Sequence, residues 1–341
     1  MNAYKNILAT GGAGFIGSTF VAQCVARGCK VVVLDKLTYA GRRENLEWIS
    51  EEGLSRRSLG EGGWELVVGD ICDRELALKL LRDHHIDALV NFAAESHVDN
   101  SISGPKAFVD TNITGTFMLL EAAREYAKAK NNFRYVQIST DEVYGELGDT
   151  GKFSETTHYA PNSPYSASKA AADHLVRAWH ETYGLDTITT HCTNNYGPRQ
   201  HPEKLIPRMI ACALAGEKLP VYGKGTNVRD WIHVEDHANG VWLALTRGKA
   251  GQAYDFGGNA EEQNINLVKK ICAILDVKRP KNSGKYEEQI AFVTDRLGHD
   301  LRYAMDDSKA QHELGFAREY TLEKGLEMTV EWYLEIKKEQ I

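Results

Sequence analysis

The sequence lacks a long apolar run, a secretion signal and an excess of positive charge, and each absence excludes a class of protein. No stretch of the 341 residues is apolar over the length that spans a bilayer, and the first residues, MNAYKNILATGG, lack the charged and apolar regions of a signal peptide. The net charge is −7, whereas a nucleic-acid-binding protein presents a basic surface. We therefore expect a cytoplasmic protein that binds neither membranes nor nucleic acid.

The sequence also lacks paired cysteines and histidines spaced as metal ligands. None of the six cysteines forms a C-x-x-C pair, and the 12 histidines show neither an H-x-H nor an H-E-x-x-H spacing. Intracellular compartments keep thiols reduced, so scattered cysteines of this kind are expected to be free thiols in the cytoplasm. No metal site is predicted.

Short apolar segments alternate with helical patterns through the first half of the chain. These segments are rich in Val, Ile or Leu and mostly continuous, as in strands that are buried on both faces of a parallel sheet. They cover residues 6–10, 30–35, 65–70, 88–93 and 135–140. The alternation predicts an α/β fold with a doubly wound parallel sheet of the Rossmann type.

A glycine-rich loop follows the first of these segments and leads into a helical pattern at 18–27. Its glycines have the spacing G-x-x-G-x-x-G and are Gly11, Gly14 and Gly17. Such a loop turns tightly, lets the backbone approach a pyrophosphate, and points the N–H groups of a helix N-terminus at the phosphates. A glycine pattern alone also occurs in turns that bind nothing, but here a strand precedes it and a helix follows it.

Two carboxylates at later strand ends extend this prediction. Asp35 ends the second segment, where it can accept hydrogen bonds from ribose hydroxyls and would repel a 2′-phosphate. This position favours NAD over NADP as the cofactor. Asp70 ends the third segment, where it could reach the adenine or simply cap the strand.

The regular alternation fades after Thr190. Four prolines and several glycines interrupt 191–235, a strand-like stretch returns at 252–257, and helical patterns follow at 265–275, at 308–314 and from 321 onwards. The charged, glycine-rich residues 50–63 predict an exposed loop without an assigned function.

These changes predict two domains. Residues 1–190, with a returning segment at about 235–260, are expected to form the NAD-binding domain. Residues 191–234 and 261–341 are expected to form a smaller, irregular α/β region that binds the substrate.

Tyr165 and Lys169 are four residues apart in PYSASKAAAD, and this spacing places them on one face of a helix. A nearby ammonium favours a phenolate, so the pKa of Tyr165 is expected to fall and the phenolate to act as a base toward an alcohol. The pattern also occurs by chance in surface pairs. The catalytic interpretation is favoured by the glycine loop and by Ser139 and Thr140 at a strand end.

Two adjacent carboxyl groups, Asp141 and Glu142, follow Thr140 in ISTDEVYGE. Like charges at this distance push their two pKa values apart, so one carboxyl can stay protonated while the other ionises. Such a pair can act as acid and base in one reaction. The repulsion does not say which residue has which role, and acidic residues at strand ends can also be inert.

These motifs resemble the extended short-chain dehydrogenase/reductase family, and more narrowly its nucleotide-sugar 4,6-dehydratases. The resemblance runs nearly end to end and depends on stretches such as TGGAGFIGS, AAESHVDNSI, STDEVYGE, NNYGPRQHPEKLIPR and YGKGTNVRDWIHVEDH. It implies that dTDP-glucose is oxidised at C4, loses water across C5–C6 and regains hydride at C6, with NAD as the cofactor. The product implied is dTDP-4-keto-6-deoxyglucose, so the resemblance implies a lyase of deoxysugar biosynthesis.

The resemblance also implies roles for individual residues. Asp141 would be the proton donor of the dehydration and Glu142 the proton acceptor. Tyr165 would assist the oxidation, with Thr140 hydrogen-bonded beside it and Lys169 in support. Two departures from the family pattern are a longer loop at 50–63 and Thr193 where serine is expected.

Further positions fall where the family holds its two ligands. Besides the glycines, Tyr165 and Lys169, the implied NAD-binding residues are Phe15, Ile16, Asp35, Lys36, Thr38, Asp70, Ile71, Ala93, Ser96, Thr111 and Asn195. Besides Thr140, the implied nucleotide-sugar-binding residues are His97, Asn194, Lys204, Leu205, Tyr222, Arg229, Asn264, Arg296 and Tyr303. Arginine suits a diphosphate because its planar fork binds two oxygens at once. Arg208 could be a further phosphate ligand or a solvated charge.

Three alternatives to this function stay open. The first is a 4,6-dehydratase that acts on UDP-glucose. The second is a nucleotide-sugar 4-epimerase, which would share the fold and Tyr165 but would not need Asp141 and Glu142. The third is a non-catalytic NAD-sensing regulator, which would not need any of these side chains. The resemblance further implies a homodimer formed through a four-helix contact by the helical patterns at 108–127 and 166–183.

Overall fold

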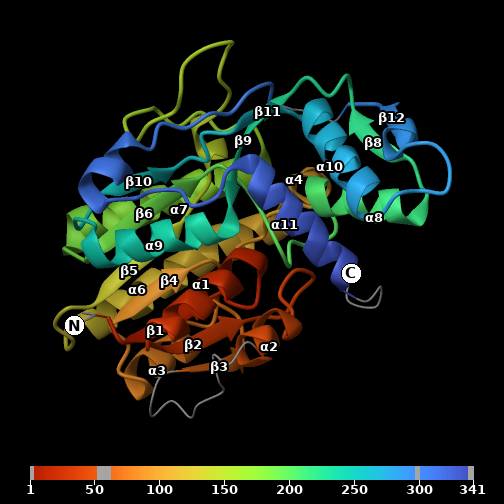
Figure 1. The fold of residues 1–341 in the computed structure, drawn as a ribbon. Helices are drawn as coiled ribbons and strands as arrows, with labels where there is room; N and C mark the ends of the chain where they lie inside the picture. The colour runs from red at the N-terminus through yellow and green to blue at the C-terminus, as the bar shows by residue number, and fades with distance from the viewer. Residues whose placement is uncertain (1–3, 52–62, 296–299, 337–341) are drawn as a thin grey trace.

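A seven-stranded parallel sheet forms the centre of the molecule in a computed structural model that describes residues 4–51, 63–295 and 300–336. The strand order is β10-β6-β5-β4-β1-β2-β3 (Figure 1). The strands are β1 (Asn6–Thr10), β2 (Lys30–Asp35), β3 (Gly63–Val68), β4 (Ala88–Asn91), β5 (Arg134–Ile138), β6 (Thr187–Cys192) and β10 (Ala253–Phe256). The predicted doubly wound parallel sheet is confirmed.

Helices cover both faces of this sheet. One face carries α1 (Phe15–Ala26) and α9 (Val234–Arg247), and the other carries α3 (Arg74–Asp83), α6 (Thr116–Ala127) and α7 (Pro164–Tyr183). The shorter helical segments of this half are α2 (Glu44–Glu51), α4 (Val98–Ser103), α5 (Lys106–Phe108), the π-helix η1 (Val109–Gly115) and the 3₁₀ turn η2 (Asp141–Tyr144). None of the helices in the described ranges is long and apolar enough to cross a membrane.

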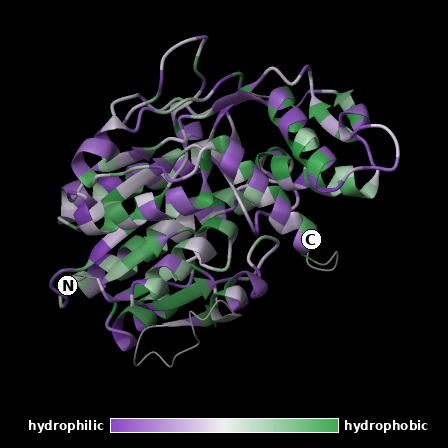
Figure 2. Ribbon diagram, in the orientation of Figure 1, coloured by the Kyte–Doolittle hydropathy of each residue, from purple (hydrophilic) through white to green (hydrophobic). Residues whose placement is uncertain are grey.

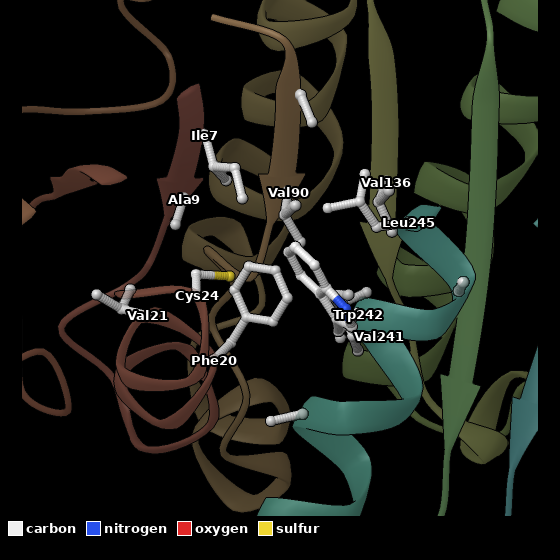
Figure 3. Packing of buried hydrophobic residues seen from close by; sticks show 14 of the residues in the cluster. Ile7, Ala9, Phe20, Val21, Cys24, Val90, Val136, Val241, Trp242 and Leu245 are labelled. Atoms are coloured by element: carbon white, nitrogen blue, oxygen red, sulfur yellow. The ribbon is translucent and has the colours of Figure 1, made fainter. Parts of the chain in front are cut away.

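Alternate residues of the central strands pack into two separate cores, one on each face of the sheet. In β1, Ile7 belongs to the core beneath α1 and α9, whereas Leu8 belongs to the core beneath α3, α6 and α7. Phe20 of α1 and Trp242 of α9 fill the first core above the sheet (Figure 3). Full burial of one such side chain contributes roughly 1.5–3 kcal/mol. The strands of the sheet carry many hydrophobic residues, as expected for this layered packing (Figure 2).

The second half of the chain forms smaller elements around a third core. β7 (Asn194–Tyr196) pairs in parallel with β9 (Val228–His233), which pairs antiparallel with β11 (Glu261–Gln263), and β8 (Leu219–Tyr222) pairs with β12 (Ile290–Val293). The helices are α8 (Leu205–Ala215), α10 (Asn264–Lys278) and α11 (Leu322–Glu335), with short segments η3 (Tyr286–Gln289) and η4 (Ala310–Leu314). α8, α10, β8 and β12 project beside the large sheet (Figure 1).

Several boundaries differ from the sequence-based expectations. The strand expected at 65–70 starts at Gly63 and ends at Val68. The helix expected from residue 18 starts at Phe15, directly after the extended residue Gly14. The strand β6 was not predicted, because Thr and His interrupt its apolar pattern, and their side chains are satisfied by partners inside the protein. Most of the loop expected at 50–63 lies outside the described residues.

Candidate active site

A cleft of about 330 Å³, here called the first cleft, opens at the carboxyl ends of β1, β2, β4, β5 and β6. It lies where the sheet order reverses between β1 and β4, the usual ligand site of a doubly wound fold. The structure places every residue predicted to hold the cofactor along this cleft: Gly11, Gly14, Phe15, Ile16, Gly17, Asp35, Lys36, Thr38, Asp70, Ile71, Ala93, Ser96, Thr111, Tyr165, Lys169 and Asn195. The roles of these residues remain predictions.

The glycine loop has the geometry that a pyrophosphate requires. Gly11 has a φ of +66°, and a Cβ there would lie 2.5 Å from the backbone nitrogen of Ala93. A Cβ on Gly17 would lie 2.3 Å from the carbonyl oxygen of Gly11, so α1 packs on the loop only without a side chain. A Cβ on Gly14 would meet only the Gly11 oxygen, at 3.2 Å. The open side of Gly14 and the N-terminus of α1 therefore form a cradle that fits a dinucleotide phosphate.

Asp35 is fixed at the end of β2 by two backbone donors. Its Oδ2 accepts from the N–H of Ala13 at 2.9 Å and its Oδ1 accepts from the N–H of Leu37 at 2.8 Å. Burial raises the pKa of Asp35, and these two hydrogen bonds act in the opposite direction. Each oxygen keeps a second lone pair, which can accept from a ribose hydroxyl. Nearby, Lys36 forms an ion pair of 2.7 Å with Asp70 on the rim of the cleft.

The turn η2 presents the two adjacent acids after β5. Thr140 caps the turn: its Oγ1 accepts from the N–H of Glu142 at 3.3 Å and donates to Oδ1 of Asp141 at 3.2 Å. Asp141 is only 3% exposed, whereas Glu142 is half-buried. The neighbouring carboxyl groups therefore lie in different environments although one peptide bond joins their residues.

Burial favours the protonated form of Asp141. Loss of solvent raises the pKa of Asp141 well above its usual range, and the negative charge of Glu142 raises it further. The Oδ2 atom of Asp141 is buried and has no hydrogen-bond partner within the described part of the chain. A protonated Asp141 can donate from this oxygen, so the site contains a carboxylic acid that is suited to the role of proton donor.

Tyr165 and Lys169 both lie in α7, as predicted, but their electrostatics differ from the expectation. Burial and the charge of Glu142 raise the pKa of Tyr165 well above its usual value, while a hydrogen bond with Thr140 acts in the opposite direction. The expected lowering of the Tyr165 pKa is wrong, because burial has the largest effect on it. The Lys169 ammonium donates to the carbonyl oxygen of Ile138 at 2.6 Å. Burial in turn lowers the pKa of Lys169.

A second cleft of about 200 Å³ adjoins the first and is lined largely by the second half of the chain. The structure places along it the residues predicted to bind the nucleotide sugar, except two: His97, Asn194, Lys204, Leu205, Tyr222, Arg229, Asn264 and Tyr303. Thr140 lines the first cleft, and Arg296 lies outside the described residues. Arg208, whose role was left open, also lines the second cleft. Glu142, Asn194 and Lys204 line both clefts and mark their junction.

Arg229 is held in β9 by backbone oxygens. Its guanidinium donates to the carbonyl oxygens of Val228 and Asp300, each at 2.8 Å, and lies 4.3 Å above the ring of Tyr303. Only 5% of the residue is exposed. The planar cation is thus fixed before any ligand binds, which reduces the entropy lost on binding.

The first cleft also contains residues that the sequence did not single out. Among them are Tyr39, Glu95, Gln200, His201 and Glu203. Burial raises the pKa of Glu95, and the ring of His201 meets Tyr39 edge-on with centroids 5.6 Å apart. These residues stand on loops after the strands, where no periodic pattern distinguishes ligand contacts from ordinary loop residues.

With this geometry established, comparison with known proteins defines the class. A family model described as GDP-mannose 4,6 dehydratase matches residues 8–329. The chain belongs to this 4,6-dehydratase family, and the expected membership of the extended short-chain dehydrogenase/reductases is confirmed.

Individual relatives are more specific. The chain is 57% identical to dTDP-glucose 4,6-dehydratase of Xanthomonas campestris pv. campestris (strain B100), over 96% of this chain and 92% of the relative. The crystal structure of DesIV, a dTDP-glucose 4,6-dehydratase from Streptomyces venezuelae solved with NAD, is 44% identical, with a TM-score of 0.86 and 97% of each chain covered. A UDP-glucose 4-epimerase from Thermus thermophilus, in complex with NAD, shares the fold at 28% identity, with a TM-score of 0.84 and coverage of 97% and 100%.

Proposed function

We propose that this protein is a hydro-lyase that converts dTDP-glucose to dTDP-4-keto-6-deoxyglucose with NAD as its cofactor. The observation that carries the proposal is the pair Asp141 and Glu142, of which the buried Asp141 lines the first cleft and the half-buried Glu142 lines both clefts. The relatives with 50–57% identity over nearly the whole chain support the same substrate.

The first cleft holds the dinucleotide and the second holds the nucleotide. The glycine loop and the N-terminus of α1 bind the pyrophosphate, and Asp35 binds the adenosine ribose. Bound NAD supplies the oxidant for C4, the reductant for C6 and a positive charge that favours the phenolate of Tyr165. Arg229 binds the diphosphate of the substrate, whose hexose then reaches the junction next to Glu142.

Tyr165 accepts the proton of the C4 hydroxyl, and the Thr140 hydroxyl can turn its one hydrogen from Asp141 to the phenol oxygen. The C4 ketone makes the proton on C5 acidic, and the carboxylate of Glu142 removes it. The C6 hydroxyl is a poor leaving group until it is protonated, and Asp141 donates that proton as water leaves. Each acid contributes on the order of 10²–10⁴-fold to the rate by general acid–base catalysis.

The 4-epimerase alternative does not account for the buried acid. Epimerisation at C4 needs a base for the C4 hydroxyl but no proton donor for a leaving group at C6. A buried carboxyl whose pKa is raised by burial and by the charge of Glu142 would have no role in that reaction, although its burial costs free energy. The likeness to the epimerase therefore supports a common oxidation step and not a common outcome.

The surface of α6 and α7 supports a homodimer. Phe117, Trp179 and Tyr183 form a chain of edge-on ring contacts with centroids 5.7 Å and 5.5 Å apart, and Phe117 and Tyr183 are exposed. In a four-helix contact, the same two helices of a second copy cover this aromatic strip. Phe117→Glu is expected to shift the protein from dimer to monomer in analytical ultracentrifugation, and a wild-type protein that sediments as a monomer would overturn the dimer.

We also place the enzyme in the cytoplasm, because all six cysteines are free thiols and a nucleotide sugar is the substrate.

The test of the function is incubation of the purified protein with dTDP-glucose without added NAD, with UDP-glucose and CDP-glucose as matched controls. We expect dTDP-glucose, in preference to the two controls, to give a 4-keto-6-deoxy product, which is detected by its absorbance in base and by its mass. Formation of the 4-epimer with no loss of water would show that the chain is a 4-epimerase and not a dehydratase.

A further inference from the structure

A histidine outside the proposed machinery lies between two buried carboxylates. His191 of β6 is 1% exposed, and its Nδ1 lies 2.9 Å from Oδ1 of Asp255 in β10. Its Nε2 lies 3.4 Å from Oδ2 of Asp173 in α7. A neutral imidazole would turn a lone pair toward one of the carboxylates, whereas an imidazolium donates from both nitrogens. The placement therefore fits the doubly protonated ring.

Two tyrosine hydroxyls complete the surroundings of this ring. Tyr144 donates to Oδ1 of Asp255 at 3.0 Å and lies 3.0 Å from Nδ1 of His191. Tyr159 lies 2.8 Å from Nε2 and donates to Oδ2 of Asp173 at 3.3 Å. With a proton on Nε2, the oxygen of Tyr159 accepts from His191 while its own hydrogen goes to Asp173. All the hydrogens then have acceptors.

The same hydrogen-bond network contacts both ends of η2, the turn that contains Asp141 and Glu142. Ser139 directly precedes Thr140, and its hydroxyl donates to Oδ2 of Asp173 at 2.6 Å. Tyr144 is the last residue of η2 and is tied to His191 and Asp255. Asp173 is also one helical turn from Lys169 and opposes the lowering of the Lys169 pKa by burial. The imidazolium thus links β6, β10, α7 and η2.

The charges around His191 favour its protonated form. Burial lowers the pKa of His191, but the hydrogen bonds and charges of Asp173 and Asp255 outweigh burial and raise it to about 10. Glu155 faces the network from beyond Asp255, because its Oε1 accepts from the N–H of Asp255 at 3.0 Å. The other titratable groups in contact with the ring are Tyr144 and Tyr159.

We propose that His191 is a positioning residue, a buried cation that holds Asp173 and Asp255 together and thereby fixes the turn that presents Asp141 and Glu142. Its consequence for turnover depends on the proposed dehydratase function, whereas the charge state of the ring does not. Removing the cation leaves two buried carboxylates without compensation, and a buried charge without its partner distorts its surroundings. The acids then lose the alignment on which proton transfer depends.

The charge state is tested in the unaltered protein. NMR of ¹⁵N-histidine-labelled enzyme between pH 6 and 9, with His191→Asn as the assignment control, is expected to show both ring nitrogens of His191 protonated throughout. A neutral ring at pH 8 would overturn the proposal whatever the substrate of the enzyme, so this outcome is distinguishable from failure of the dehydratase function.

The positioning role is tested by kinetics with dTDP-glucose. His191→Asn is expected to lower kcat by about 10- to 100-fold while KM changes by less than about threefold, because the nucleotide binds in the second cleft. The double variant His191→Asn/Asp255→Asn removes one uncompensated carboxylate and should regain part of kcat. The matched control is His174→Asn, an exposed histidine beside Tyr159, which should match wild type.

A merely structural histidine would give a different pattern. His191→Asn would then unfold at a lower temperature but turn over at the wild-type kcat once folded, and that result would overturn the proposal. If the single variant does not fold, the double variant and the NMR measurement decide instead. A folded double variant without measurable turnover would contradict the positioning role, and a neutral ring in the wild type would by itself exclude the charged link.

Discussion

The two clefts differ in how the chain builds them. The first cleft is built from segments that directly follow parallel strands, so its residues come in short motifs such as the glycine loop after β1 and the acids after β5. The second cleft gathers single side chains from α4, α8, β8, β9 and the start of α10. The comparison shows that the proposed catalytic and cofactor-binding residues lie in segments that directly follow parallel strands. The residues proposed to bind the substrate come together only through contacts between distant parts of the chain.

This difference also separates the expected functions of the clefts. Substitutions in the first cleft should change cofactor retention and kcat, and substitutions in the second should change KM. A residue such as Glu142 that lines both should affect the chemistry and not the affinity, because a carboxylate is an anion and does not bind a diphosphate.

The largest effect is expected from Asp141→Asn in the first cleft. The amide cannot donate a proton to the departing hydroxyl as a carboxylic acid does, so product formation should fall by about 10²–10⁴-fold. The KM for dTDP-glucose should change little. Stopped-flow and steady-state assays measure both quantities, and a variant with normal kcat would remove Asp141 from the chemistry.

The next effect concerns the glycine loop. A Cβ on residue 17 would lie 2.3 Å from a backbone oxygen, so Gly17→Ala must shift α1 and should release the dinucleotide from the purified protein. The bound nucleotide can be extracted and measured by chromatography. Gly148→Ala is the matched control, since a Cβ there meets no atom of the described residues within 4 Å. Equal nucleotide content in both variants would contradict the assignment of the loop.

A smaller effect, confined to the second cleft, is expected from Arg229→Lys. The ammonium keeps the charge but loses the planar fork and its fixed position, and a hydrogen bond to a charged group is worth about 1.5–3 kcal/mol. KM should therefore rise by about 10- to 100-fold with kcat nearly unchanged. A fall in kcat at constant KM would erase the distinction between the clefts.

The smallest effect is on stability and concerns pH. The pKa of Asp141 is higher in the folded protein than in the unfolded chain, so its proton stabilises the fold at low pH, and this contribution is lost as pH rises toward the folded pKa. In that window the wild type should lose about 1.4 kcal/mol of stability per pH unit relative to Asp141→Asn. Urea unfolding at pH 5 and pH 6 measures the difference, and parallel pH curves would contradict it.

The sheet and the first cleft could largely be predicted from sequence because both depend on local patterns. Continuous Val, Ile and Leu identified five strands, and the loop after β1 was visible from three glycines. The predictions failed where tertiary contacts determine the secondary structure or the pKa of a side chain. β6 contains Thr and His that are satisfied only by distant partners, and the pKa of Tyr165 follows from burial rather than from its spacing to Lys169.

The positions in the second cleft came from family resemblance and not from any pattern. Arg229 is fixed by carbonyl oxygens of residues 300 and 301, about 70 positions away, a contact that no local motif predicts. The network around His191 was missed for the same reason, since Asp173, His191 and Asp255 meet only after α7, β6 and β10 have packed together.

The central claim is that the two acids act on one hexose whose C4 has already been oxidised. The most direct measurement is Glu142→Gln with dTDP-glucose in D₂O, following reduced nicotinamide by absorbance and deuterium at C5 by mass spectrometry. The account predicts that C4 is oxidised while no solvent deuterium enters C5. Deuterium incorporation at the wild-type rate would contradict it, because another group would then be the base.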